Sequence, residues 1–383
     1  MDKFRIRTAL IKIIKGELNE KTYNAESFTN DEILSIYELA KLHDLAHVVT
    51  EWCFKNNLMI TNPVFMQKQV FTLQRFEQMN SVLDSVIKVF EKAQIPFIPL
   101  KGSVLRNYYP NPTIRTSCDI DVLIKKADLK RAESILIKEL GYTPFHKDTH
   151  DIAFSTPNDI TLELHFDLIE KNVVGVAEKP LANVWKSAIL KAGTKFHYVL
   201  SDELFYYYHI IHMAKHFLNG GCGIRSVMDV WVLNNKIPFD KEKRDDLLKS
   251  GNLLKFANKM ETLCEIWFGD SETSSEFENV ESYIIFGGTY GNAKNEAIVK
   301  STVKTHKFSY LISRIWVPYE TLKFEYPSLN GKKYLILFYQ IHRWFRFIFT
   351  SKKRKFEENK KNSVVNAANS QKAREMLDFL GLD

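Results

Sequence analysis

Apolar positions recur at helical spacing at both ends of this chain. The runs 31–53 and 81–93 place leucine, isoleucine and valine side chains on one side of a helix. The same spacing returns at 202–217 and 224–234, on either side of a loop that contains three glycines. We therefore expect mostly helical structure in the first part of the chain and again in its second half.

Between these ends the apolar runs are shorter and turn residues separate them. The pattern predicts, in order, a strand, a short helix, a second strand, an amphipathic helix and a β-hairpin, at 95–100, 104–109, 119–124, 128–140 and 152–166. Gly141 ends the amphipathic helix, and Pro157, Asn158 and Asp159 form the hairpin turn. Strands and helices in this order predict an α+β fold with a small mixed sheet between helical regions.

The same patterns divide the chain into four regions. We expect a helical N-terminal region, a mixed-sheet domain, a helical C-terminal domain that closes a cleft, and a basic, partly disordered tail with a short helix, at 1–93, 94–195, 196–350 and 351–383.

The predicted strand 119–124 carries two carboxylates on one face. Side chains alternate across a strand, so Asp119 and Asp121 point to one side while their apolar neighbours point into a core. Two adjacent carboxylates repel each other unless a cation lies between them, and a hard divalent ion such as Mg²⁺ prefers oxygen ligands. In the second hairpin strand, Glu163 and His165 share a face. If the two strands are neighbours, Glu163 adds a third carboxylate, and such a trio can hold two ions about 3.5–4 Å apart.

Asp151 is the main alternative to Glu163 as the third carboxylate. It opens the other hairpin strand, whereas Glu163 lies in the middle of its own strand. We prefer Glu163, because the centre of a strand holds a ligand more rigidly than its end.

The sequence Lys101-Gly102-Ser103 lies where the first predicted strand meets the short helix. Gly102 lets the backbone approach a phosphate closely, and the start of the helix offers unpaired N–H groups. The Ser103 hydroxyl and the Lys101 ammonium are therefore candidate contacts of a triphosphate. Arg115, four residues before Asp119, is a candidate clamp on developing phosphate charge.

In this order and spacing, the motifs resemble a known superfamily. The run IPFIPLKGSVLRNYYPNPTIRTSCDIDVLI followed by ITLELHFDL is similar to DNA polymerase β-like nucleotidyltransferases, and most of all to a bacterial group described as "nucleotidyltransferase family protein". The resemblance implies that Gly102 and Ser103 bind the triphosphate. The metal ligands it implies are Asp119, Asp121 and Glu163, the last at a position where the wider superfamily more often has aspartate.

The resemblance continues into the helical region through HMAKHFLNGGCGIRSVMDVWVL. His212 and His216 have the i, i+4 spacing of helical metal ligands, but with no third soft ligand evident we favour a structural role or a polar wall of the cleft. Arg225 and Asp229 have the same spacing. It indicates either a surface ion pair worth about 0.2–0.5 kcal/mol or an arginine that faces the nucleotide and is oriented by the aspartate. His165, two residues beyond the third carboxylate, is a further candidate cleft residue.

Composition and charge narrow the range of partners. The net charge of +7, from 53 basic and 46 acidic residues among 383, fits a protein that handles phosphates but is too low to suggest a groove for long nucleic acids. The 4 cysteines include no CxxC pair and match neither a zinc site nor a disulfide framework, so we expect a reducing, cytoplasmic compartment. No run is long and apolar enough for a spanning helix, and the first residues lack a signal peptide's apolar core.

The segment 334–355 combines a strongly apolar helical pattern with a basic end. A basic amphipathic helix of this kind can lie on an anionic membrane surface. Helices this apolar are more often packed in a core, which is the interpretation we favour, with peripheral membrane contact as the alternative.

Together these features predict a magnesium-dependent enzyme with two bound ions. We expect it to transfer a nucleoside monophosphate from a nucleoside triphosphate, with ATP the expected nucleotide, to an acceptor hydroxyl and to release pyrophosphate. The acceptor is a small molecule, a sugar, a peptide or a protein. Two other hypotheses stay open: a non-catalytic module that binds nucleotides or a partner, and a phosphotransferase that moves the γ-phosphate.

Overall fold

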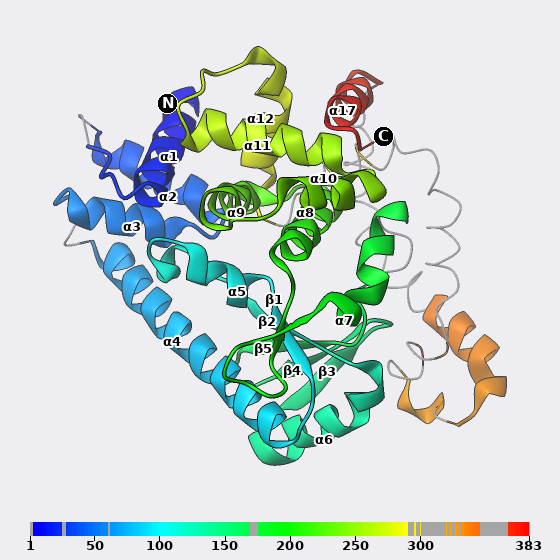
Figure 1. Cartoon of the computed structure of the whole chain (residues 1–383). Coiled ribbons are helices and arrows are strands. Elements are labelled where there is room, and N and C mark those ends of the chain that lie inside the picture. Colours follow the sequence, from blue (N-terminus) through cyan, green and yellow to red (C-terminus); the bar gives the residue numbers. More distant parts are fainter. Residues whose placement is uncertain are drawn as a thin grey trace.

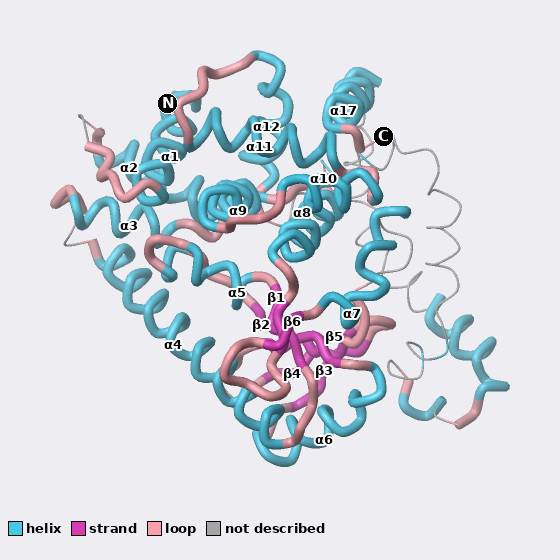
Figure 2. Tube along the Cα trace, viewed as in Figure 1, coloured by secondary structure: helices cyan, strands magenta, loops and turns pink. Residues whose placement is uncertain are grey.

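A small mixed sheet lies against a layer of helices in the computed structural model of this protein (Figure 1). Figure 2 shows the strands gathered below that layer, with further helices on their other side. The expected α+β class is therefore confirmed. The structure describes residues 3–24, 28–59, 62–168, 175–289, 295, 299, 319, 322, 326–329, 331–344 and 367–382.

Five strands form the sheet in the order β1-β2-β5-β4-β3. Their bounds are β1 Phe97–Leu100, β2 Asp119–Ile124, β3 Thr143–Lys147, β4 Asp151–Ser155 and β5 Thr161–His165. The predicted hairpin is the pair β4–β5, and β2 and β5 are parallel neighbours. Sequence reasoning did not predict β3, because this edge strand has no fully buried residue and hence no apolar run.

Helices supply most of the remaining described structure. Those before and within the sheet domain are α1 Lys3–Leu18, α2 Asn30–Lys41, α3 Ala46–Lys55, α4 Pro63–Lys92, α5 Gly102–Leu105 and α6 Leu129–Leu140. After the sheet come α7 Val184–Ser187, a two-stranded ribbon of β6 Ile189–Leu190 and β7 Tyr198–Val199, α8 Asp202–Leu218, α9 Gly223–Lys236, α10 Lys241–Ser250, α11 Leu254–Phe268, α12 Glu278–Gly287 and α17 Ala367–Leu380. The short helix predicted within the tail 351–383 corresponds to α17.

The helical run expected over 31–53 is broken into α2 and α3. Asp44 between them has a φ of +54°, a conformation that a helix does not continue. The break places His43 in the interior, where its ring contacts the Ile285 carbonyl at 2.9 Å and the Ile224 amide at 3.2 Å. Apolar spacing continues across the break, so the sequence pattern alone did not reveal it.

The two faces of the sheet belong to different cores. One face packs its apolar residues, such as Ile120 and Leu162, against α4 and α6. On the other face, Ile98, Leu100 and Leu123 join the core of the helical layer. Alternation along β2 therefore turns Asp119 and Asp121 toward the helical layer.

Helices from both ends of the described chain share the core of that layer. Leu10 of α1 and Trp52 of α3 belong to the same buried cluster as Tyr206 of α8 and Trp267 of α11. Figure 1 shows α1 beside α11, and the two helices are in contact. The predicted region boundaries at 93, 195 and 350 stay predictions.

Among the residues that the structure describes, no helix has the length and apolar character needed to cross a membrane. The predicted amphipathic segment 334–355 is described only as far as 344, and its basic end lies outside the described residues. In the described part, Leu337 and Phe338 are 59% and 63% exposed, so this part is not the core helix that we favoured. Contact with a membrane stays a prediction.

Phe90→Ala is expected to lower the free energy of unfolding by about 3–5 kcal/mol, because it empties a site between α4 and the sheet. The Phe90 ring is fully buried and lies 5.8 Å from the Phe97 ring, centroid to centroid. Denaturant unfolding followed by circular dichroism measures the loss. Val70→Ala on the same helix is the control, since Val70 is 65% exposed and its truncation should change stability by less than about 0.5 kcal/mol. Equal effects of the two substitutions would contradict this account of the core.

Candidate active site

The carboxylate of Asp121 lies at the centre of a buried charge cluster. Its exposure is 1%, and its Oδ1 atom lies 2.7 Å from the Lys101 ammonium and 2.8 Å from Nε2 of His165. Burial alone would raise the pKa of Asp121, but these two cations hold it below its ordinary value. Asp121 is therefore ionised in the ligand-free protein, and its Oδ1 atom is paired with both cations.

Glu163 lies beside Asp121 on the neighbouring strand. The parallel register pairs Asp121 with Glu163, so both side chains are on the same face of the sheet. His165 links them, because its Nε2 atom is also 3.4 Å from the Glu163 carboxylate. Burial disfavours the charged imidazole, but its hydrogen bonds to Asp121 and Glu163 outweigh burial and raise the pKa of His165 to about 9. Ligand atoms of these three residues lie within 4.8 Å of one another.

Asp119 is the least compensated carboxylate of the site. Burial and the nearby charge of Asp121 raise its pKa to about 6, and the attraction of Lys101 only partly offsets them. Among the described residues, ligand atoms of Asp121, Glu163 and His165 converge within 4.8 Å, and Asp119 is not part of that group. Asp119, Asp121 and Glu163 nevertheless share one face of the sheet, and all three are oxygen ligands. That donor set fits a hard divalent cation such as Mg²⁺.

The turn between β1 and α5 is strained at Lys101, whose φ is +46°. Gly102 follows, and a β-carbon at this position would lie 2.9 Å from Cβ of Ser117, so only glycine fits without a shift. Ser103 is buried, and its hydroxyl has no hydrogen-bond partner among the described residues. The ion pair with Asp121 draws the Lys101 side chain over the carboxylates.

Asp229 of α9, in the helical layer, forms an ion pair with Arg115. The Nε and Nη2 atoms of Arg115 lie 2.7 and 2.9 Å from the two carboxylate oxygens, in a bidentate pair. The Tyr109 hydroxyl donates a third hydrogen bond to the same carboxylate at 2.5 Å. Asp229 is 1% exposed, so this network is buried and fixes the direction of Arg115.

The pair that the sequence suggested between Arg225 and Asp229 is wrong. Arg225 instead donates to the Asp44 carboxylate at 2.9 Å and to the Thr116 carbonyl at 3.0 Å. Arg225 and Asp229 are both buried, because α9 lies inside the helical layer. Their side chains therefore pair with residues of other elements and not with each other. Asp229 orients Arg115, and Asp44 orients Arg225.

A cavity of about 410 Å³ separates the sheet from α8 and α9. The predicted site residues that line it are Lys101, Gly102, Arg115, Asp119, Glu163, His165, His212, His216, Arg225 and Asp229. Asp151, the alternative third carboxylate, also lines it, whereas Ser103 and Asp121 are buried and are not part of the lining.

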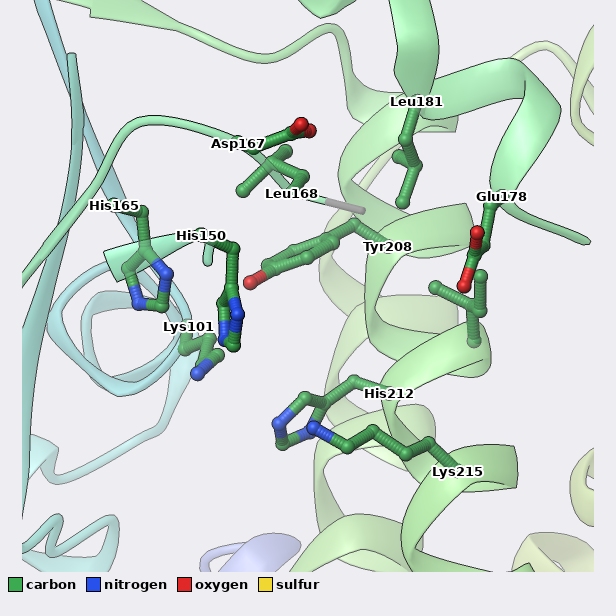
Figure 3. Close-up of a pocket in the computed structure, with 11 residues that line it drawn as sticks. Lys101, His150, His165, Asp167, Leu168, Glu178, Leu181, Tyr208, His212 and Lys215 are labelled. Atoms are coloured by element: carbon green, nitrogen blue, oxygen red, sulfur yellow. The ribbon is translucent and has the colours of Figure 1, made fainter. Parts of the chain in front are cut away.

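His212 and His216 form a polar wall of this cavity. Their Nε2 atoms lie 3.2 Å apart, and burial together with the charge of Lys101 lowers the pKa of His212 well below its ordinary value. Neither histidine belongs to a group of three potential metal ligands among the described residues. Figure 3 shows His212 and Tyr208 of α8 facing Lys101 and His165 around an adjoining pocket.

Sequence reasoning missed several residues that shape the site. Tyr208 lines the cavity but lies within an apolar helical run, where tyrosine resembles a core residue. Tyr109 and Asp44 act only through long-range partners, for which local spacing offers no signal. The register Leu100–Asp121 brings Lys101 to Asp121, and pairing β1 with β2 from the sequence would have revealed it.

Residues 30–269, more than half of the chain, match the family described as "Uncharacterised nucleotidyltransferase". The chain belongs to this family. As a nucleotidyltransferase it takes a nucleotide as substrate. No curated protein matches the enzyme. Among solved structures, it is similar to the antibiotic-resistance factor ANT(2'')-Ia at 11% identity and a TM-score of 0.26, over 50% of this chain and 91% of that one.

Asp119→Asn is expected to stabilise the ligand-free nucleotidyltransferase by roughly 1–3 kcal/mol at about pH 7.5. The pKa of Asp119 is about 6 in the folded protein against 3.8 as its ordinary value, so the folded state binds this proton more tightly than the unfolded state. The wild-type enzyme therefore loses stability as pH rises from about 4 to about 6, and an uncharged amide avoids that loss.

Denaturant unfolding at about pH 4.5 and about pH 7.5 measures this difference. The increase in the free energy of unfolding caused by Asp119→Asn should be smaller at the lower pH, because there a smaller fraction of the wild-type protein carries the unfavourable Asp119 charge. Asp128→Asn is the matched control, because Asp128 lies outside the carboxylate group, at the start of α6. If the stabilisation by Asp119→Asn does not depend on pH, or if Asp128→Asn produces the same stabilisation, then the ionised Asp119 carboxylate does not destabilise the folded protein.

Proposed function

We propose that this nucleotidyltransferase transfers a nucleoside monophosphate from a nucleoside triphosphate to an acceptor hydroxyl and releases pyrophosphate. The acceptor oxygen forms a bond to the α-phosphorus, the bond from the α-phosphorus to the bridging oxygen breaks, and the hydroxyl proton leaves. ATP is the expected nucleotide. The observation that carries the proposal is the β2–β5 register, which aligns Asp121 with Glu163 on the face that also carries Asp119.

The carboxylate group would hold two Mg²⁺ ions. Asp119 and Asp121 would bind both, and Glu163 would bind the one nearer the acceptor. When bound, such ions supply charge to the phosphate oxygens and lower the pKa of the acceptor hydroxyl. Burial and the nearby charge of Asp121 raise the pKa of Asp119, and a bound cation would offset both effects, which supports a cation at this point. Asp151 lies opposite His165 on β4, one strand farther from β2, which favours Glu163 as the third ligand.

Lys101 and Arg115 would bind the triphosphate. Both line the cavity near the carboxylates, and Asp229 keeps the Arg115 guanidinium in a fixed direction. Lys101 would leave Asp121 for a phosphate oxygen once the carboxylate has another positive partner. Gly102 would let the backbone approach the phosphates, and the unpartnered hydroxyl of Ser103 supports a role for it at the same turn.

The size of the cavity supports a small acceptor. About 410 Å³ lies within the range of ligand pockets for small molecules. An acceptor hydroxyl next to Glu163 has a carboxylate to accept its proton. Together with the modest net charge of +7, this volume favours a sugar, another small molecule or an exposed peptide or protein side chain over a long nucleic acid.

Labelled ATP tests the reaction. We expect label from the α-phosphate, and none from the γ-phosphate, to appear in small-molecule or protein fractions of a lysate incubated with the enzyme and Mg²⁺. Pyrophosphate should form in equal amount, and a chelator should abolish both products. Transfer of γ-label instead would establish a phosphotransferase and overturn the proposal.

Asp119→Ala and Asp121→Ala are each expected to lower the rate of label transfer by about 100-fold or more, because each removes a carboxylate from the proposed metal site. Calorimetry should show that both variants lose the Mg²⁺-dependent part of nucleotide binding. Asp128→Ala, on the same domain but outside the carboxylate group, should keep wild-type rate and binding. Unchanged transfer in Asp121→Ala would rule out this assignment of the metal ligands.

A further inference from the structure

We propose that His150, Asp151 and one ring nitrogen of His165 form a separate site for a borderline transition-metal ion such as Zn²⁺. This site is chemically different from the carboxylate group of Asp119, Asp121 and Glu163. It does not depend on the proposed reaction, because only coordination chemistry and local geometry support it.

The three side chains converge on one point. One ring nitrogen from each histidine and one carboxylate oxygen of Asp151 all lie within 4.8 Å of one another. Nε2 of His150 is 3.8 Å from Oδ1 of Asp151. The two imidazole rings are inclined by 28° with their centroids 6.1 Å apart, and Figure 3 shows them side by side.

Backbone pairing holds the three residues in place. Asp151 lies opposite His165 in the antiparallel register of β4 and β5. The His150 carbonyl accepts hydrogen bonds from the amides of Phe166 and Asp167 at 2.9 and 3.3 Å. The candidate ligands thus come from paired strand ends, a scaffold that holds a metal site with little freedom.

Two of the candidate ligands have buried polar atoms without a partner. Asp151 is 7% exposed and His165 is 4% exposed. Oδ1 of Asp151 and Nδ1 of His165 are both buried and receive or donate no hydrogen bond among the described residues. Buried polar atoms are normally satisfied, so two orphans in one cluster point to a ligand. Asp151 and His165 also line the cavity, from which an ion can enter.

The hydrogen bond of His165 to Asp121 leaves its other nitrogen for an ion. Nε2 lies 2.8 Å from the Asp121 carboxylate, so Nδ1 is the nitrogen that remains. Histidines that bind metals commonly donate their second N–H to a carboxylate in this way. Two imidazoles and one carboxylate suit Zn²⁺ or a similar ion rather than Mg²⁺, which prefers oxygen ligands. Three protein ligands beside a cavity leave a fourth position open.

Metal binding to the chelator-treated enzyme tests the site. Calorimetric titration with Zn²⁺ in excess Mg²⁺ is expected to reveal one site, and Co²⁺ in its place should give the visible absorption of a four- or five-coordinate ion with nitrogen ligands. His150→Ala and Asp151→Asn should each weaken Zn²⁺ binding by about tenfold or more. Asp121→Asn should weaken it by about 10–100-fold, the usual effect of removing an outer-sphere carboxylate.

Two controls keep the test independent of the proposed function. His146→Ala removes an exposed histidine that lines the same cavity but lies outside the cluster, and it should leave Zn²⁺ affinity unchanged. Asp119→Asn should likewise keep Zn²⁺ binding, even though it disrupts the carboxylate group. Thermal unfolding verifies that each variant is folded.

The proposal is overturned if His150→Ala binds Zn²⁺ as the wild-type enzyme does. It is also overturned if Mg²⁺ displaces the Zn²⁺, or if Asp119→Asn abolishes binding, since the ion would then occupy the carboxylate group. None of these measurements requires nucleotide transfer. Zn²⁺ binding therefore tests the metal site even if the proposed reaction proves wrong.

Discussion

The buried charge of Asp121 constrains the arrangement of the sheet and of everything packed over it. A carboxylate taken out of water is costly unless cations and hydrogen bonds compensate for the lost hydration. Lys101 and His165 provide that compensation at 2.7 and 2.8 Å, and they come from the ends of the two strands that flank β2. The charge therefore ties β1, β2 and β5 together beyond their backbone hydrogen bonds. It also requires a strained turn at Lys101, where the positive φ costs about 1–3 kcal/mol.

The two aspartates of β2 lie in different electrostatic environments. Asp121 is paired with Lys101 and His165, whereas burial and the neighbouring charge of Asp121 raise the pKa of Asp119 to about 6. An unrelieved repulsion of this kind lowers stability, and proteins keep such features where a ligand relieves them. In the proposed function, Asp121 would thus be the carboxylate anchored by the chain, and Asp119 the one whose charge a bound cation would offset. In the proposed reaction, Lys101 is the group that changes partner.

Sequence reasoning reached the local elements of the site but not their long-range partners. Alternation along β2 and the hairpin turn are properties of a few adjacent residues, so the shared face of Asp121 and Glu163 followed once the strands were assumed to be neighbours. The i, i+4 spacing of Arg225 and Asp229 shows only that they share a side of α9. It does not tell which neighbours that side meets, and buried packing gave each residue a partner more than 100 positions away. The break at Asp44 was missed for a different reason, because apolar spacing continues across it.

His165 belongs both to the cluster around Asp121 and to the proposed metal site with His150 and Asp151. Its Nε2 atom contacts the Asp121 carboxylate, while its Nδ1 atom has no hydrogen-bond partner among the described residues. A single imidazole cannot change its contacts on one side without changing its charge and tautomer on the other. If both proposed sites are occupied, an ion held near Asp151 would change the charge balance at Asp121, and by thermodynamic reciprocity a cation at Asp121 would change metal affinity near Asp151 to the same degree. A substitution of His165 would thus affect both the cluster around Asp121 and the proposed metal site. The spacing of Glu163 from the aspartates does not reveal this link.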